Sequence, residues 1–401
     1  MNILFVCHRF PFPPNRGGKI RPFQMIRRLS EEHSVTVASL AHTEQELAEG
    51  RGLGEHCDEI IAEVVPNGAR WSRAVGALLG AKPSSAAYFW SPRLQARIRA
   101  AAAQKRFDVL MVHCAFVAPY VVDLGIPRRI LDFGDIDSRK YFDYAEQRAM
   151  PLSWGFRLDG GKLRRFEKQL AARFDQCTVT TAGELDEFRK FGVRTPCRVI
   201  PNGVDFDYFR FRQALPDSGS TIVFLGRMDY YPNIDAVSFF VRDCLPLVQR
   251  DVPGARLLIV GSSPSKRVQE LGETPGVTVT GHVPDVRPFL DQASVTIAPL
   301  RIARGTQNKI LECMSAGVPV VSTSPAAKGI QATPGEHLLV ADDPGDFAAQ
   351  VVRVLGSREL QRNLAIAARR QVEAAHDWQR SLSALADLVS PEPAAPAQKP
   401  A

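Results

Sequence analysis

Residues 297–321 read IAPLRIARGTQNKILECMSAGVPVV, and this stretch decides the fold. The pattern predicts a buried strand, a polar turn that contains Gly305, an amphipathic helix and a second buried strand. The turn leaves free backbone N–H groups and Lys309 at a helix N-terminus, which is a suitable place for a phosphate. Glu312 follows three residues later on the same helical face, where its carboxylate could accept hydrogen bonds from a ribose diol. Together these two features indicate a nucleotide-sugar site.

The composition is that of a globular protein with two domains. A chain of 401 residues is too long for one ordinary core, and 45% of its residues are hydrophobic. The formal net charge of +7 favours an anionic partner such as a nucleotide or an acidic membrane surface. Seven cysteines without a C-x-x-C pair argue against disulfides and a zinc site. With no long apolar run and no basic leader, we expect a cytoplasmic protein.

Short apolar runs alternate with helical patterns along the whole chain, which predicts parallel sheets built from βαβ units. The fold class is therefore α/β, with two doubly wound parallel-sheet domains. The expected strands of the first half are 3–7, 35–40, 59–65, 109–113, 129–133 and 177–181. Those of the second half are 222–225, 256–260, 277–280, 295–298, 318–322 and 337–340.

Turn-forming residues divide the chain into segments. We expect an N-terminal Rossmann-like domain over residues 1–200, a linker over 201–220 and a C-terminal Rossmann-like domain over 221–388. A single helical pattern at about 358–388 ends the second domain, which leaves open that this helix packs back on the first. The Pro- and Ala-rich tail, 389–401, is expected to be disordered.

Several motifs together resemble glycosyltransferase family 4, the retaining enzymes of the GT-B fold. They are IPNGVDFDYF (200–209), IVFLGRMDYYPNIDAV (222–237), LLIVG (257–261), VTVTGHVPDVRPFL (277–290) and the opening stretch, 297–321. The resemblance implies two facing Rossmann-like domains with a cleft between them. It also implies that the nucleotide sugar binds mainly to the C-terminal domain and the acceptor to the N-terminal domain. The chain is similar to sugar transferases of bacterial exopolysaccharide and exosortase systems.

The resemblance assigns the donor site to the C-terminal half. Arg227 and Lys309 are the expected catalytic cations, because they could stabilise the charge that develops on the leaving β-phosphate. Glu312 is expected to bind the ribose hydroxyls. Gly226 lies directly before the arginine, and the backbone N–H groups of Gly305 and Thr306 are candidates for holding the sugar hydroxyls.

Two positions depart from the family pattern. Arg304 stands where a glutamate is usual, and Pro232 stands where a lysine is common. Arg304 and Lys309 could restore the lost positive charge, so we include Arg304 among the donor-binding residues. A weakened or inactive enzyme is the alternative.

In the N-terminal half, Gly17–Gly18 precedes a helix, and glycines there would let the backbone approach a phosphate or an acceptor closely. Arg21, one helical step later, is expected to point toward the same ligand. A plain turn is the simpler interpretation of the glycine pair.

Two further candidates follow neighbouring strands of the same half. His113 ends a strand at the carboxyl edge, where open α/β sheets bind ligands. The next strand runs into a cluster of carboxylates at 132–138, in which Asp135 is our candidate for positioning or deprotonating the acceptor. The alternatives are a buried core histidine and a helix-capping aspartate.

Two basic and partly apolar stretches suggest contact with an anionic membrane. The first contains Trp71, Val75, Leu78 and Leu79 beside Arg70, Arg73 and Lys82. The second contains Leu163, Phe166, Leu170 and Phe174 beside Lys162, Arg164, Arg165, Lys168 and Arg173. For the second stretch, a surface helix packed on its sheet is the more common structure.

The sequence therefore predicts a retaining glycosyltransferase that moves a sugar from a nucleoside-diphosphate sugar to a glycan or lipid-linked acceptor in bacterial polysaccharide synthesis. We expect no cofactor and no required metal, because helix and basic residues already neutralise phosphate. An inactive sugar-nucleotide-binding scaffold protein and a nucleotide-sugar 2-epimerase remain alternatives. A dehydrogenase is disfavoured because no G-x-G-x-x-G follows the first strand, and nucleic-acid binding has only the net charge to support it.

Overall fold

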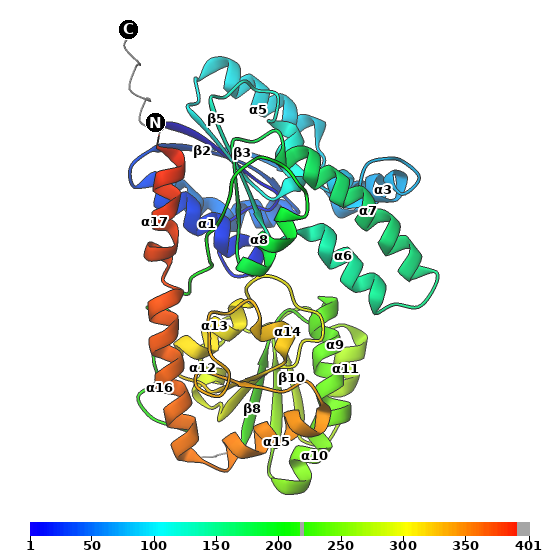
Figure 1. The fold of residues 1–401 in the computed structure, drawn as a ribbon, viewed down its shortest axis with the longest axis vertical. Helices are drawn as coiled ribbons and strands as arrows, with labels where there is room; N and C mark the ends of the chain where they lie inside the picture. The colour runs from blue at the N-terminus through cyan, green and yellow to red at the C-terminus, as the bar shows by residue number, and fades with distance from the viewer. Residues whose placement is uncertain (217–219, 391–401) are drawn as a thin grey trace, which may run out of the picture. The chain divides into compact units, whose positions relative to one another are not determined.

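The computed structural model describes residues 1–216 and 220–390, which form two compact units. The first unit comprises Met1–Pro201 and the chain from Leu382 onward, and the second comprises Asn202–Ser381. Each unit is built around one parallel β-sheet with helices on its faces (Figure 1). Over the described residues, no helix combines the length and apolar character needed to cross a bilayer. Most of the predicted disordered tail, from residue 391, lies outside the described residues.

The sheet of the first unit has seven strands in the order β3-β2-β1-β4-β5-β6-β7. Its central strands are almost entirely buried because helices cover both faces. The strands are β1 Asn2–Cys7, β2 Ser34–Ala41, β3 Glu59–Val64, β4 Val109–His113, β5 Arg128–Gly134, β6 Gln176–Val179 and β7 Cys197–Val199. The helices are α1 Gly17–Ser30, α2 Glu44–Glu49, α3 Asn67–Ala77, α4 Ser84–Tyr88, α5 Pro92–Gln104, α6 Asp137–Glu146, α7 Leu152–Ala171 and α8 Ala182–Arg189, with short turns η1 Gly50–Glu55 and η2 Ala115–Tyr120.

The sheet of the second unit has six strands in the order β10-β9-β8-β11-β12-β13. The strands are β8 Thr221–Leu225, β9 Arg256–Val260, β10 Val277–Gly281, β11 Val295–Ala298, β12 Val320–Ser322 and β13 Leu339–Val340. The helices are α9 Tyr231–Phe239, α10 Leu245–Asp251, α11 Lys266–Leu271, α12 Arg287–Asp291, α13 Asn308–Ser315, α14 Ser324–Ala327, α15 Pro344–Leu355, α16 Arg358–Ala375 and α17 Trp378–Val389, with the turn η3 Phe240–Cys244. From Leu382, α17 belongs to the first unit.

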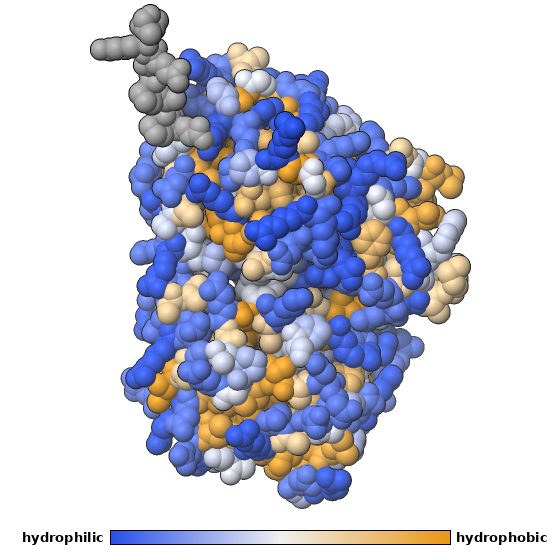
Figure 2. Space-filling view, in the orientation of Figure 1, coloured by the Kyte–Doolittle hydropathy of each residue, from blue (hydrophilic) through white to orange (hydrophobic). Residues whose placement is uncertain are grey.

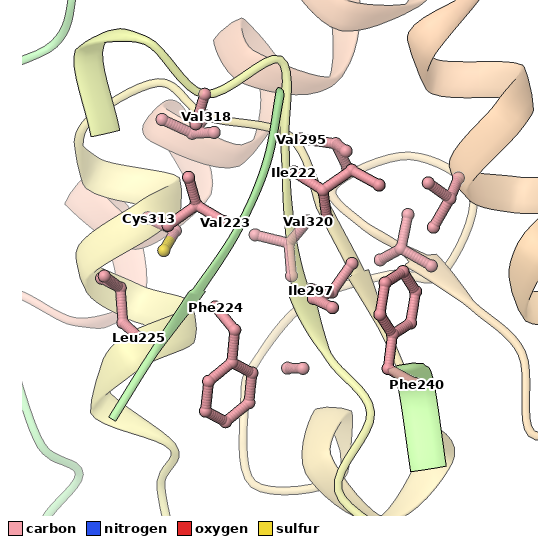
Figure 3. Packing of buried hydrophobic residues seen from close by; sticks show 14 of the residues in the cluster. Ile222, Val223, Phe224, Leu225, Phe240, Val295, Ile297, Cys313, Val318 and Val320 are labelled. Atoms are coloured by element: carbon pink, nitrogen blue, oxygen red, sulfur yellow. The ribbon is translucent and has the colours of Figure 1, made fainter. Parts of the chain in front are cut away.

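One hydrophobic cluster fills the second unit on both faces of its sheet. Figure 3 shows Cys313 of α13 beside Val223 and Leu225 of β8, with Ile297 of β11 and Val320 of β12 in the same cluster. The opening stretch of sequence thus contributes a strand, a helix and a second strand to one core. This packing fixes α13 with its N-terminus at the carboxyl edge of the sheet.

Each predicted strand is present, although several ends shift by one or two residues. The prediction missed β7, a short edge strand that is only half-buried. The single helix expected over 358–388 is wrong, because the chain breaks between α16 and α17 at His376. There the ring Nδ1 lies 2.8 Å from the carbonyl oxygen of Asn202, and the backbone of Asp377 bridges to Val204. Residues at the start of the expected linker are therefore packed in the second unit.

Candidate functional site

At the carboxyl edge of the second sheet, the structure brings together residues from the ends of β8 and β11. Lys309 on α13 donates a hydrogen bond from Nζ to Asn233 Oδ1 at 2.6 Å, and Asn233 Nδ2 donates to the carbonyl oxygen of Arg227 at 2.8 Å. The lysine Nζ also lies 4.3 Å from the centroid of the Phe224 ring, a favourable cation–π distance. Lys309 and the backbone of Arg227 thus belong to one local network.

Glycines let the strand ends approach one another at this edge. A Cβ on Gly226 would lie 3.0 Å from the Lys309 Nζ, and a Cβ on Gly261 would lie 1.7 Å from the Gly226 carbonyl oxygen. Gly261 also has a φ of +149°, which residues with side chains rarely adopt. Only glycine fits this contact between the β8 and β9 turns.

Lys309 and Glu312 lie on the half-exposed face of α13, opposite its buried residues. Burial lowers the pKa of Lys309 to about 7, although the charge of Glu312 opposes this shift. Burial raises the pKa of Glu312 to about 7, against the opposing effect of Lys309. Among the described residues, the Glu312 carboxylate accepts no hydrogen bond, so its oxygens are open to a ligand. Both groups are thus close to their titration point near neutral pH.

The turn before α13 carries the other predicted donor-binding residues. Gly305 has a φ of +57°, a left-handed conformation that favours glycine. The Thr306 hydroxyl is buried and has no hydrogen-bond partner in the part of the chain that the structure describes. Gln307 caps the helix without a side-chain hydrogen bond to its first N–H groups. Arg304 is half-buried in the same turn, and its carbonyl oxygen accepts a hydrogen bond from Gln307 Nε2 at 2.9 Å.

Arg227 directs its guanidinium to a neighbouring carboxylate. Its Nε lies 3.0 Å from Asp229 Oδ1, and this hydrogen bond raises the pKa of the arginine. The side chain keeps 39% of its surface exposed. A phosphate would therefore compete with Asp229 for this cation.

In the first unit, a buried carboxylate organises the edge where β4 and β5 end. Asp132 is fully buried and accepts hydrogen bonds from Arg21 Nε at 2.9 Å, Arg21 Nη2 at 2.7 Å and Thr178 Oγ1 at 2.6 Å. His113 Nδ1 lies 2.7 Å from the second carboxylate oxygen. Burial acts to raise the pKa of Asp132, but the Arg21 charge and these hydrogen bonds hold it well below its usual value. Because this anion accepts only, Nδ1 of His113 is the donor.

This network corrects the expectation for Arg21. The side chain is 2% exposed and also donates to the carbonyl oxygen of Ile200 at 2.8 Å, so it does not point toward a ligand. Its position one turn into α1 aims it at the sheet rather than along the loop that holds Gly17–Gly18. These two glycines form the first residues of α1, and a Cβ on Gly18 would lie 3.3 Å from Arg9 Cδ.

Carboxylates after β5 have distinct surroundings. Asp135 is half-buried and accepts a hydrogen bond from Thr180 Oγ1 at 2.7 Å. Asp137 begins α6, and burial raises its pKa to about 6. Our sequence interpretation included Asp137 in the carboxylate cluster at 132–138 but chose Asp135 as the candidate. The sequence interpretation also missed Asn233, the partner of Lys309. Its position after a strand and the turn at Gly226 could have indicated a place at the carboxyl edge of the sheet.

The apolar residues of the second basic stretch pack inward, whereas Arg165 and Lys168 are exposed. Leu163, Leu170 and Phe174 are 0%, 5% and 4% exposed, so this apolar face covers its own domain. Leu163, Leu170 and Phe174 are therefore not available for contact with a membrane. Over residues 1–216 and 220–390, no group of three or more His, Cys, Asp or Glu side chains is arranged to hold a metal ion.

Solved structures share this architecture. Sucrose-phosphate synthase from Thermosynechococcus elongatus is 17% identical with a TM-score of 0.71, and the match covers 97% of this chain and 98% of that chain. HepE from Anabaena, in complex with UDP-glucose, is 16% identical with a TM-score of 0.67, covering 96% and 98% of the two chains. Two Rossmann-like sheets of this kind define the GT-B class of nucleotide-sugar-dependent transferases and confirm the predicted fold.

Family comparisons match both halves of the chain. The Glycosyltransferase Family 4 model matches residues 16–208, and the Glycosyl transferases group 1 model matches residues 219–357. The protein belongs to glycosyltransferase family 4. It is also similar to an uncharacterized 44.6 kDa protein of the cps region of Klebsiella pneumoniae, with 20% identity over 380 residues that cover 90% of this chain and 94% of the relative.

Proposed function

We propose that the protein is a retaining glycosyltransferase that uses a UDP-sugar and extends a glycan or lipid-linked acceptor in capsular or exopolysaccharide synthesis. The UDP donor is supported by the similarity to HepE, which was solved with UDP-glucose. The pathway is supported by the relative in a cps region. The proposal rests most directly on the arrangement of Lys309 and Glu312 on α13.

In this proposal, Lys309 and Arg227 neutralise the diphosphate as the sugar bond breaks. Preorganised cations at a developing negative charge contribute on the order of 3 kcal/mol each to lowering the barrier. Glu312 accepts hydrogen bonds from the ribose diol, and the unpartnered Thr306 hydroxyl is a candidate for a ligand oxygen. Together they account for recognition of a ribonucleoside diphosphate.

The first unit supplies a histidine for the donor sugar and carboxylates for the acceptor. Asp132 fixes the ring of His113, so that its Nε2 is left to interact with a sugar hydroxyl. Asp135 or Asp137 positions the acceptor hydroxyl. Attack from the front face of the donor, with the leaving phosphate taking the acceptor proton, retains the anomeric configuration.

A turnover assay tests this proposal. Purified protein is incubated with a panel of UDP-, GDP- and ADP-sugars and a bacterial lipid-linked acceptor extract, and nucleotide release and product anomers are followed by NMR. We expect UDP release from one donor, a retained anomer, and at least tenfold slower release with Glu312→Ala. The control Glu359→Ala, an exposed carboxylate on α16, should keep full activity.

Other outcomes discriminate the alternatives. Nucleotide binding without turnover by any donor would favour the inactive scaffold. Release of UDP together with a C2-epimerised free sugar would indicate the epimerase. Turnover restricted to a GDP- or ADP-sugar would contradict the proposed donor class.

A further inference from the structure

One edge of the first unit exposes large apolar side chains. On α3 and just after it, Trp71 is 62%, Val75 61%, Leu78 54% and Leu79 100% exposed. At the start of α7 and just before it, Met150 is 71%, Leu152 58%, Trp154 59% and Leu158 48% exposed. We call these eight residues the α3–α7 surface. Concentration of exposed apolar groups of this size is typical of an interaction site.

Hydrogen bonds join the two segments that form this surface. Lys162 on α7 donates from Nζ to the Leu78 carbonyl oxygen at 2.7 Å, and the Ser84 N–H donates to Asp159 Oδ1 at 3.0 Å. Figure 1 places α3 and α7 together at one side of the unit, and Figure 2 shows several hydrophobic residues among hydrophilic ones along that side. The apolar residues of α3 and α7 therefore belong to one continuous part of the molecule.

The segments that carry the α3–α7 surface are mainly basic, and Glu146 at the end of α6, an exposed acid close to Met150 in the sequence, is paired with Arg139. No acidic residue occurs between Glu63 and Asp108. Between residues 147 and 171 the only acids are Asp159 and Glu167, which are 5% and 1% exposed. Both carboxylates accept hydrogen bonds within the unit, Asp159 from the Ser84 N–H and Glu167 from the Ser138 N–H. Exposed basic residues of these segments include Lys82, Arg157, Arg165 and Lys168.

We propose that the α3–α7 surface docks on an anionic lipid bilayer. Tryptophans and aliphatic side chains would enter the interfacial region, while the surrounding cations would contact acidic headgroups. A second copy of the chain fits poorly, because the same mainly basic segments would then face one another. Docking would bring the enzyme to a lipid-linked acceptor, so this inference rests in part on the proposed function. Docking itself does not require turnover.

Vesicle co-sedimentation tests the docking. The full chain is mixed with phosphatidylcholine vesicles or with vesicles that also contain phosphatidylglycerol, and the bound fraction is measured at low and high salt. We expect binding to the anionic vesicles only, weakened by salt. Leu79→Glu combined with Trp154→Glu, and separately Arg157→Glu combined with Arg165→Glu, should each lower the affinity about tenfold or more.

Matched controls lie on the second unit. Ile366→Glu replaces an apolar residue that is 38% exposed on α16, and Arg353→Glu reverses an exposed charge on α15. Both should bind vesicles like the wild type, and all variants should titrate UDP normally, which separates docking from the proposed activity. Equal binding to neutral vesicles, no binding to either, or a dimer that the α3–α7 substitutions dissolve would overturn the proposal.

Discussion

Asp132 illustrates how one buried carboxylate can hold a candidate site histidine, His113, in place. Removal of its charge would leave the Arg21 guanidinium buried without a counterion. We therefore expect Asp132→Asn to lower the free energy of unfolding by about 3 kcal/mol, measured by urea denaturation. The control Asp186→Asn, in an exposed pair with Arg189, should change it by less than about 1 kcal/mol.

The same substitution has a pH signature. The pKa of Asp132 is lower in the folded protein than in the unfolded chain, where it is about 3.9. The ionised carboxylate therefore stabilises the fold above about pH 3.9, and this stabilisation is lost as the pH falls further. Wild-type stability should decline more steeply below about pH 4 than that of Asp132→Asn. The ¹⁵N NMR signals of His113 should also show loss of the single Nδ1–H tautomer. An unchanged histidine spectrum would argue against a positioning role.

Lys309 gives a second prediction at the residue scale. Its pKa is lowered to about 7, so the free protein loses this charge as the pH rises through neutrality. UDP affinity should then fall by up to about tenfold per pH unit above 7, measured by calorimetry. Lys309→Arg should remove this alkaline loss, since a guanidinium stays protonated. The exposed control Lys266→Arg should retain it.

The sequence allowed part of this site to be predicted. The pairing of Lys309 with Glu312 could be predicted because a helix places residues three apart on one face. The hydrogen-bond network of Asp132 could not be predicted, since Arg21 and Thr178 lie 111 and 46 residues away from Asp132 in the sequence. Spacing along the chain carries no information about such pairs, and Arg21 was therefore expected to point toward a ligand rather than to Asp132.

At the scale of elements, α13 depends on a tight contact between two turns. A Cβ on Gly329, just after α14, would lie 1.8 Å from the Gly305 carbonyl oxygen. Gly329→Ala must therefore displace the turn that carries Thr306, and we expect about a tenfold loss of UDP affinity with about 1–3 kcal/mol of destabilisation. Gly254→Ala, whose nearest neighbour would be 3.9 Å away, is the control. Wild-type affinity in both variants would contradict this account of the turn.

Most elements were predictable because buried parallel strands consist of short apolar runs. β7 escaped detection because its three residues are only partly buried and lack that pattern. The break between α16 and α17 could not be predicted from the sequence for a different reason. Apolar residues continue on both sides of His376, and the contact that ends α16 comes from the distant Asn202.

At the scale of the whole molecule, the repetition of βαβ units predicted two parallel sheets, and the structure confirms them. The proposed chemistry needs no bound cation, since Lys309 and Arg227 neutralise the diphosphate. Chelator should therefore leave the rate of UDP release unchanged within about twofold. Loss of turnover with EDTA and recovery with Mg²⁺ would refute this part of the mechanism.

The central claim is that the carboxyl edge of the second sheet binds UDP through α13 and the turn after β8. Calorimetric titration of the full chain with UDP, GDP, ADP and CDP tests it most directly, with Glu312→Ala and Arg227→Ala as site variants and Glu359→Ala as control. The account predicts micromolar binding of UDP alone, weakened at least about tenfold in both site variants and unchanged in the control. No binding of any nucleotide to the wild type, or UDP binding that survives both substitutions, would contradict it.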